Sequence, residues 1–301
     1  MQCDHQILFV RIFITALALA ICAAGSLAQT DVENAINQLD AVNVRGYIQP
    51  LADLYGADIS AGSFRSAYIP RDGISVHLDL LGMVSQVTDG EKTYTVQLPP
   101  GYTQKTAVQP TIFGPAATVV KDPSGFQYKG SDGMIDASYF PHGVAQLTIG
   151  SFDGTEAFGR LFITPALGTN KLPKTTLYGG GVRHSISQYL GDPPLDIAAG
   201  FSYNRMTIGD LITINAVTIG AQASKNWSIL GVYGGLAWEK NSLTLNYTPT
   251  ASGVATSIDI DGANTFCATG GVTLSLGFLR LFADANLGSV TTFSGGIGFG
   301  N

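Results

Sequence analysis

Apolar and polar residues alternate along much of the chain from residue 144 to the C-terminus. The clearest runs lie at residues 195–204, 242–248, 272–277 and 279–287. A period of two predicts β-strands that have one apolar and one polar face. Gly, Asn and Asp interrupt the runs at regular intervals, as expected where turns join consecutive strands. The pattern therefore predicts an all-β region of antiparallel strands.

The composition of the polar face indicates which face points outward. Only 13% of the residues are charged, against about 25% in ordinary soluble proteins. The polar positions hold mainly Ser, Thr, Asn and Gly, which suit a crowded, wet interior, whereas Leu, Ile, Val and aromatic side chains suit contact with lipid. No apolar stretch after the first 28 residues has the length of a membrane-spanning helix. We therefore expect an antiparallel transmembrane β-barrel, since a closed barrel satisfies all backbone groups in lipid; the alternative is a soluble secreted sandwich or barrel.

The spacing of the turns sets the expected size of this barrel. Residues 144–301 have room for roughly ten strands at about 15 residues per strand and turn, and residues 63–98 add two or more. We expect about 12 strands, within a range of roughly 10 to 14, and an even number. A barrel of that size has a narrow interior that side chains partly fill.

The first 28 residues have the features of a signal peptide. An apolar stretch follows Arg11, and Ser26-Leu27-Ala28 supplies small residues for cleavage after Ala28, with Ala24 as the second choice. Cys22 suggests a lipoprotein, but the bulky Ile21 before it argues against lipidation. Cleavage leaves Cys267 as the one cysteine, so an internal disulfide and a thiolate metal site are both excluded. Export by a cleaved signal peptide places the barrel in the outer membrane of a Gram-negative bacterium.

Two further segments accompany the strands. Residues 29–59 carry apolar side chains at helical spacing and predict a short N-terminal helical segment. The barrel is expected at residues 60–301, interrupted by a proline-rich loop at residues 99–143. Together the helical segment and the loop can form a plug or a periplasmic lid. An N-terminal helix on the surface and an extracellular loop explain the same sequence equally well.

Charged residues on the polar faces are the best candidates for function. On luminal faces they form opposed charges that either cross-link the walls, which is the simpler interpretation, or tune ion selectivity. The candidates are Arg160, Arg183, Asp196, Arg280 and Asp284.

Other sequence features do not make a convincing catalytic, metal or cofactor site. His184 and Ser185 are adjacent on a strand and point to opposite faces, so they cannot act together. Asp259 and Asp261 match only part of a calcium loop. The glycine run at residues 295–300 is not followed by a helix that could receive a phosphate. A net charge of −6 argues against binding of nucleic acid. From these features together, we expect that the protein is not an enzyme and that it binds no metal, cofactor or nucleic acid.

Distinctive motifs lie at residues 46–50, 55–56, 60–63, 110–114, 154–157, 180–190 and 194–197. They resemble those of an uncharacterised bacterial family of predicted outer-membrane barrels. The resemblance covers roughly residues 44–301 and implies the barrel and the envelope location, but no activity. An architectural likeness to transporters of the fatty-acid porin type rests on the short helix before the strands.

Two classes of function remain open. The first is a passive channel or transporter for small or hydrophobic solutes of unknown identity. The second is a plugged structural or surface-interaction barrel that does not transport. The expected partners are outer-membrane lipid, the barrel-assembly machinery and, for a transporter, a small solute or hydrophobic ligand.

Overall fold

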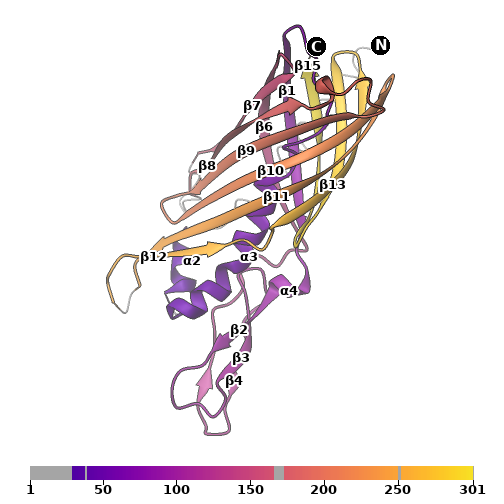
Figure 1. Cartoon of the computed structure of the whole chain (residues 1–301). Coiled ribbons are helices and arrows are strands. Elements are labelled where there is room, and N and C mark those ends of the chain that lie inside the picture. Colours follow the sequence, from indigo (N-terminus) through magenta and orange to yellow (C-terminus); the bar gives the residue numbers. More distant parts are fainter. Residues whose placement is uncertain (1–28, 38, 166–172, 250–251, 301) are drawn as a thin grey trace, which may run out of the picture.

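The computed structural model describes residues 29–37, 39–165, 173–249 and 252–300. In this part of the chain, ten antiparallel strands close into a barrel (Figure 1). The predicted signal peptide, residues 1–28, lies outside the described residues. The ten strands are β1 (Ser75–Gln86), β6 (Tyr139–Phe152), β7 (Thr155–Thr164), β8 (Thr175–Ser185), β9 (Asp196–Ile208), β10 (Ile212–Trp227), β11 (Leu230–Tyr247), β13 (Phe266–Leu276), β14 (Leu279–Leu287) and β15 (Thr291–Gly300).

The ring closes where the first and last strands meet. β1 pairs with β15 on one side, with His77 opposite Gly300, and with β6 on the other. A short additional strand, β12 (Thr256–Asp261), pairs with the C-terminal part of β11, while β13 pairs with its N-terminal part. The all-β, antiparallel barrel predicted from the alternation is therefore confirmed. Its ten strands lie within the expected range but number two fewer than the central expectation, in part because only β1 from residues 63–98 joins the ring.

The two ends of the barrel differ. We call the end where β1 begins and β15 ends the upper end, and the opposite end the lower end (Figure 1). Turns of two residues, at 153–154, 228–229 and 277–278, join strands at the upper end, together with the connection that holds the 3₁₀ helix η1 (Ser187–Tyr189). The long segment 87–138 leaves β1 and returns to β6 at the lower end.

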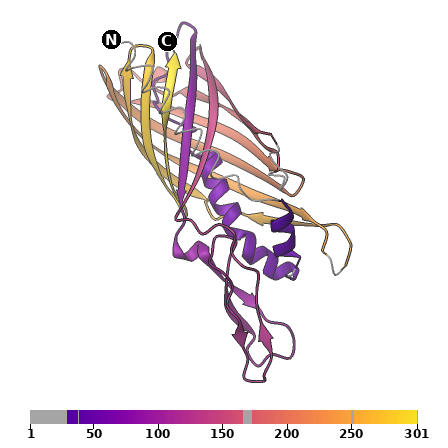
Figure 2. The same ribbon diagram turned by 180° about the vertical axis from the view of Figure 1, so that it is seen from behind.

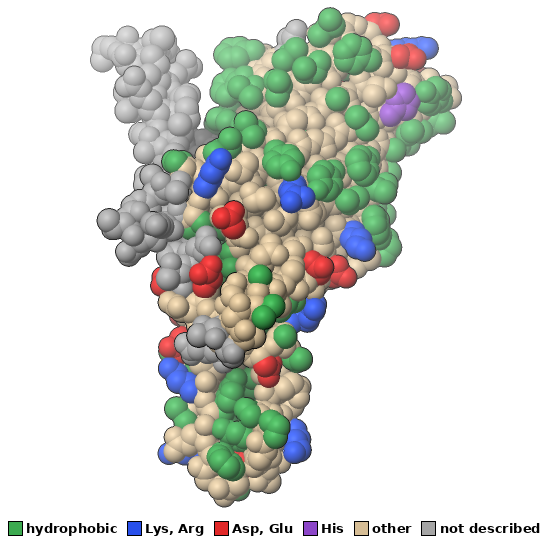
Figure 3. Space-filling view, turned by 90° about the vertical axis from the view of Figure 1, so that its left-hand side faces the viewer, with side chains coloured by type: hydrophobic (Ala, Val, Ile, Leu, Met, Phe, Trp, Pro, Cys, Tyr) green, Lys and Arg blue, Asp and Glu red, His purple; other side chains and the backbone are tan. Residues whose placement is uncertain are grey.

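Apolar side chains cover the outer face of the upper barrel. Along β1, Leu78 is 47% exposed on the outside, whereas Asp79 is fully buried on the inside. The same alternation places Phe201 and Leu236 on the outer surface, and also Phe293, which lies nearer the lower end. Figure 3 shows hydrophobic side chains gathered over the upper barrel, with charged side chains more frequent towards the lower end. Over this height, the expected arrangement of apolar residues outside and small polar residues inside is correct.

Near the lower end the chemistry of the two faces is reversed. The sequence places Leu243, Leu245 and Tyr247 on the apolar face of β11, and we expected that face to contact lipid. Instead all three side chains are buried inside the barrel, and Ser242 and Thr244 point outward. The expectation fails here because the lower parts of β10 and β11 pack around a helix, so their inner face is the one that must be apolar.

Two helices precede the barrel. They are α2 (Gln29–Ile36) and α3 (Ala41–Ser60). The carboxylate of Asp40 accepts a hydrogen bond of 2.9 Å from the backbone N–H of Asn43 and caps the N-terminus of α3. Figures 1 and 2 show α3 inclined into the lower end of the barrel. Within the described residues, no helix combines the length and the apolar character needed to cross a membrane.

The segment at residues 87–138 forms a projection below the barrel (Figure 2). It begins with the short helix α4 (Asp89–Lys92) and contains two small hairpins, which lie partly within the proline-rich loop expected at residues 99–143. The hairpins are β2 (Thr93–Gln97) with β3 (Thr106–Pro110), and β4 (Val120–Lys121) with β5 (Gln127–Tyr128). The hydroxyl of Tyr47 in α3 donates a hydrogen bond of 2.7 Å to the carbonyl of Asp132, so the projection and α3 are held together.

Candidate functional site in the barrel interior

Helix α3 fills the lower half of the interior. It contacts β1, β6, β9, β10, β11, β12 and β15, so strands around the ring touch it. Its large apolar side chains, including Tyr47, Ile48, Leu51, Leu54 and Ile59, have no exposed surface. Burying one such side chain contributes roughly 1.5–3 kcal/mol. The helix is therefore packed into the barrel as part of one hydrophobic core.

Polar contacts hold the C-terminal end of α3. The Ser85 hydroxyl donates a hydrogen bond of 2.7 Å to Oδ1 of the buried Asp58. Arg160 Nη1 donates to the carbonyl of Ile59 at 3.1 Å. A Cβ atom at Gly56 would lie 2.7 Å from the Cβ of Asn241, so only glycine allows this close approach of the helix to β11.

Residues 61–74 continue from α3 through the upper half of the interior to the start of β1. Arg183 Nη1 and Gln222 Nε2 donate hydrogen bonds of 2.9 and 3.1 Å to the carbonyl of Ser66. The backbone N–H of Ala67 donates to the Ser224 hydroxyl at 2.9 Å. The ring of Phe64 lies against the inner wall, where a Cβ at Gly200 would come within 2.8 Å of it. Contacts to β8 and β10 therefore fix the course of this segment.

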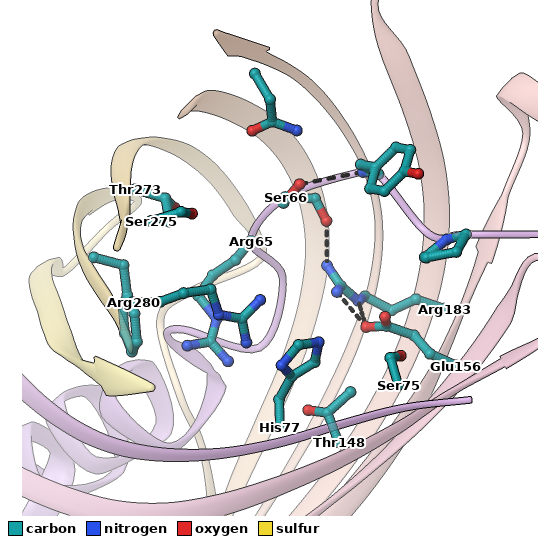
Figure 4. Close-up of a pocket in the computed structure, with 14 residues that line it drawn as sticks. Arg65, Ser66, Ser75, His77, Thr148, Glu156, Arg183, Thr273, Ser275 and Arg280 are labelled. Carbon is teal, nitrogen blue, oxygen red and sulfur yellow. Dashed lines mark hydrogen bonds and ion pairs between the residues drawn. The ribbon is translucent and has the colours of Figure 1, made fainter. Parts of the chain in front are cut away.

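Beside this segment the upper interior contains a cavity of about 310 Å³, which we call the vestibule. Figure 4 shows Arg65 and Arg280 on one side of it, Arg183 and Glu156 on the other, and His77 between them. Its hydroxyl-bearing lining residues are Ser66, Tyr68, Ser75, Thr148, Thr273 and Ser275.

Two carboxylates partly balance the charges around the vestibule. Arg183 Nε donates a hydrogen bond of 2.8 Å to Glu156. Arg65 Nη2 lies 2.7 Å from Oδ2 of the fully buried Asp79, and Arg280 Nη2 lies 3.5 Å from Oδ1 of the same carboxylate. The Arg65 guanidinium also stacks over the Phe282 ring at 4.1 Å. Three guanidinium groups thus face two carboxylates.

The five charged residues singled out in the sequence take different positions. Arg183 and Arg280 line the vestibule. Arg160 is buried deeper, where its Nε donates to Gln146 at 2.9 Å. Asp284 is also buried and accepts hydrogen bonds from Tyr233 at 2.8 Å and from Asn286 and Ser294. Asp196 stands apart at the first position of β9 and forms no ion pair with the described residues.

Four residues of this arrangement were missed in the sequence. His77 and Asp79 lie on the polar face of the alternating stretch that became β1, and Glu156 shares a strand face with Arg160, so the period-two pattern could have identified them. Arg65 lies in a segment without periodicity. The sequence holds no signal for its position, because tertiary contacts alone determine it.

His184 lies outside the barrel interior, on the opposite strand face from Arg183. Its ring nitrogens are 2.7 Å from the Thr155 hydroxyl and 2.8 Å from the Tyr189 hydroxyl. Ser185 is buried on the other face, as the strand pattern predicted. His184 and Ser185 therefore cannot act together as a base and a nucleophile.

Comparisons with known proteins give distant structural likenesses and one family. The outer membrane protease OmpT from Escherichia coli is 8% identical, with 78% of this chain and 98% of that chain covered and a TM-score of 0.36. The attachment invasion locus protein Ail of Yersinia pestis is 11% identical, with 76% and 99% covered and a TM-score of 0.27. A Pseudomonas aeruginosa FadL homologue is 9% identical, with 85% and 96% covered and a TM-score of 0.21.

No curated protein matches the chain significantly. One family model matches nearly its whole length, residues 6–301, and is described as a family of unknown function (DUF6588). This agrees with the resemblance to an uncharacterised family found in the sequence motifs. The chain belongs to this family of unknown function.

Proposed function

We propose that the protein is an outer-membrane β-barrel that its own helix α3 closes, and that it acts as a surface-interaction protein rather than as an open channel. The observation that carries this proposal is the packing of α3 into the lower mouth, where it contacts strands around the ring. The plugged barrel was the second of the two classes that the sequence left open.

The outer surface supports a place in a membrane. Large apolar side chains such as Leu236 and Phe266, each 72% exposed, cover the outer face of the barrel, while polar residues line its upper interior. This is the distribution expected of a barrel whose outside contacts lipid and whose inside contacts water. A water-soluble monomer rarely exposes an apolar surface of this extent.

The lengths of the connections support one orientation. Outer-membrane barrels have short periplasmic turns and longer extracellular loops. The two-residue turns lie at the upper end, and the 87–138 projection lies at the lower end. The upper end with its vestibule then faces the periplasm, and the projection with α3 faces the cell exterior. A projection exposed in this way is available for contact with other molecules.

Passage of solutes through this barrel would require α3 to leave its site. Exposing five fully buried apolar side chains of α3 would cost on the order of 10 kcal/mol. Thermal motion does not supply such a displacement often enough for steady conduction. A passive channel is therefore the less favoured function, and a transporter would need a partner or ligand that displaces the helix.

Planar-bilayer recordings test the proposal. The complete mature chain should give no discrete conductance steps at high protein load, whereas a variant lacking residues 29–60 should give them. Heat-modifiable gel mobility establishes that each variant is folded. If the deletion does not fold, the double variant Leu51→Ala and Leu54→Ala, which loosens the same packing, replaces it. Discrete steps from the complete chain would overturn the proposal.

A further inference from the structure

The vestibule reaches the upper rim of the barrel. Among its lining residues, Ser75 is the first residue of β1, and Asn226 and Ser275 are each one position from the upper end of their strands. The lining side chains face the lumen, so water rather than lipid fills the approach to the cavity. The vestibule lies at the opposite end from the mouth that α3 closes, so its binding chemistry is independent of the proposed function.

The charges around the vestibule leave a surplus of one positive charge. Glu156 balances Arg183 through a direct ion pair. Asp79 is shared between Arg65 at 2.7 Å and Arg280 at 3.5 Å, so one carboxylate serves two guanidinium groups. Asp79 has no exposed surface and does not line the cavity, whereas both arginines do. The surplus is therefore presented to the cavity by Arg65 and Arg280.

Hydrogen-bond donors on this side of the cavity are unused. A guanidinium has five N–H donors, and Arg280 makes no hydrogen bond with the described residues besides its ion pair with Asp79. Arg65 directs one donor at Asp79, and its guanidinium is held in place over Phe282. Thr273 and Ser275 add two hydroxyl groups from β13 that have no hydrogen-bond partner in the described part of the chain.

We propose that the vestibule binds a small, soluble phosphate-type anion between Arg280, Arg65 and the hydroxyls of Thr273 and Ser275. Arginine presents paired N–H groups that match two oxygens of such an anion. A cavity of about 310 Å³ accommodates a phosphate with a small organic substituent. Glu156 lies across the cavity and is neutralised by Arg183 (Figure 4), so its carboxylate does not repel an anion at Arg280.

Titration of inorganic phosphate into the purified full-length protein at low ionic strength tests this site. We expect saturable binding of one phosphate per chain, which Arg280→Gln weakens about tenfold through the loss of charge-assisted hydrogen bonds. Arg280→Lys should fall between the two, since it keeps the charge but not the paired donors. Lys105→Gln removes the same charge from an exposed position on the projection and should leave binding unchanged.

A second variant keeps the proposal testable if Arg280→Gln does not fold. The double variant Thr273→Val and Ser275→Ala retains every charge and should weaken phosphate binding about threefold. Heat-modifiable mobility is measured for each variant as the folding control. The absence of saturable binding to the wild-type protein would overturn the proposal. Equal affinity of the wild type and the folded Arg280→Gln or double variant would also overturn it.

Discussion

The lower and upper halves of the barrel interior are built from the same strands but by different chemistry. Along β1 the inward side chains are His77 and Asp79 near the upper end and Leu81 and Met83 further down. The lower half is packed with apolar side chains around α3, and the upper half holds arginines, carboxylates and a cavity. The period of two determines which residues point inward. Whether these inward residues are apolar or polar depends on what they contact, which is α3 in the lower half and the cavity in the upper half.

This difference separates two ways of filling a barrel. In the lower half the driving force is burial of apolar surface, which depends on shape and volume. In the upper half, paired charges and hydrogen bonds hold residues 61–74 and leave room for water. Substitutions in the two halves should therefore fail for different reasons.

The largest effect is expected from a charge in the apolar half. Leu51→Asp places a carboxylate among fully buried side chains, and an unpaired buried charge should destabilise the plug by about 5 kcal/mol. The loss of stability is measured as a fall in the temperature at which the protein loses the gel mobility of its folded form. Val42→Asp introduces the same group at a position of α3 that is 65% exposed, and it should leave that temperature nearly unchanged. Equal effects at the two positions would show that α3 is not packed in the barrel.

The charged half should respond most strongly at Asp79. Asp79→Asn leaves Arg65 and Arg280 without their shared carboxylate, and removing one partner of a buried ion pair costs about 3 kcal/mol. The control is Asp153→Asn, which breaks an exposed pair with Arg71 and should cost less than about 1 kcal/mol. Denaturant unfolding followed by tryptophan fluorescence compares the variants. A stability loss at Asp79 no larger than that at Asp153 would contradict the assignment of the buried charge network.

The sequence was sufficient to predict the barrel, but it left open whether the helical segment at residues 29–59 lies inside it. The alternation of Leu279, Leu281 and Ala283 with Arg280 and Asp284 could be assigned to a lipid face and a lumen face because the period is local. That Leu243 and Leu245 face inward could not be foreseen, since the reason lies in a helix roughly 190 residues earlier in the chain.

The charged site shows the same limit. The inward direction of Arg183 and Arg280 follows from strand parity, but their partners follow from register and from the course of residues 61–74. Asp79 is flanked by leucines and carries no sequence feature that distinguishes a shared counter-ion from an ordinary polar position. The register of β1 and β14 against β15 brings it to Arg280, since both residues lie opposite Gly298, and the course of residues 61–74 brings Arg65 to it. The sequence does not encode either arrangement locally.

A smaller effect tests how closely the helix approaches the wall. Gly56→Ala brings a methyl group to 2.7 Å from Asn241 Cβ, and such overpacking should destabilise the protein by about 1–3 kcal/mol. The matched control is Gly90→Ala in α4, where the nearest atom is 3.5 Å away. The two variants are compared by the same heat-modifiable mobility as Leu51→Asp. A neutral Gly56→Ala would mean that α3 can shift away from β11, which would favour a movable plug.

The smallest effect concerns the projection and its response to acid. The hydrogen bond from the backbone N–H of Ala117 to the Asp132 carboxylate, together with the nearby Lys129, lowers the pKa of Asp132. Because the folded pKa lies below the unfolded one, the stabilisation is fully present above the unfolded value near 3.9 and is lost as the pH falls through the folded pKa. The protection of the Ala117 amide against hydrogen exchange, relative to its chemical rate, should therefore fall in acid in the wild type. In Asp132→Asn the acceptor remains but does not titrate, so exchange at Ala117 should follow only the pH dependence of the chemical rate.

The control is Asp136→Asn, which changes an exposed carboxylate 3.6 Å from Lys92 and should retain the wild-type acid response. An identical acid response in Asp132→Asn would assign the local stability of the projection to its contacts with α3 instead.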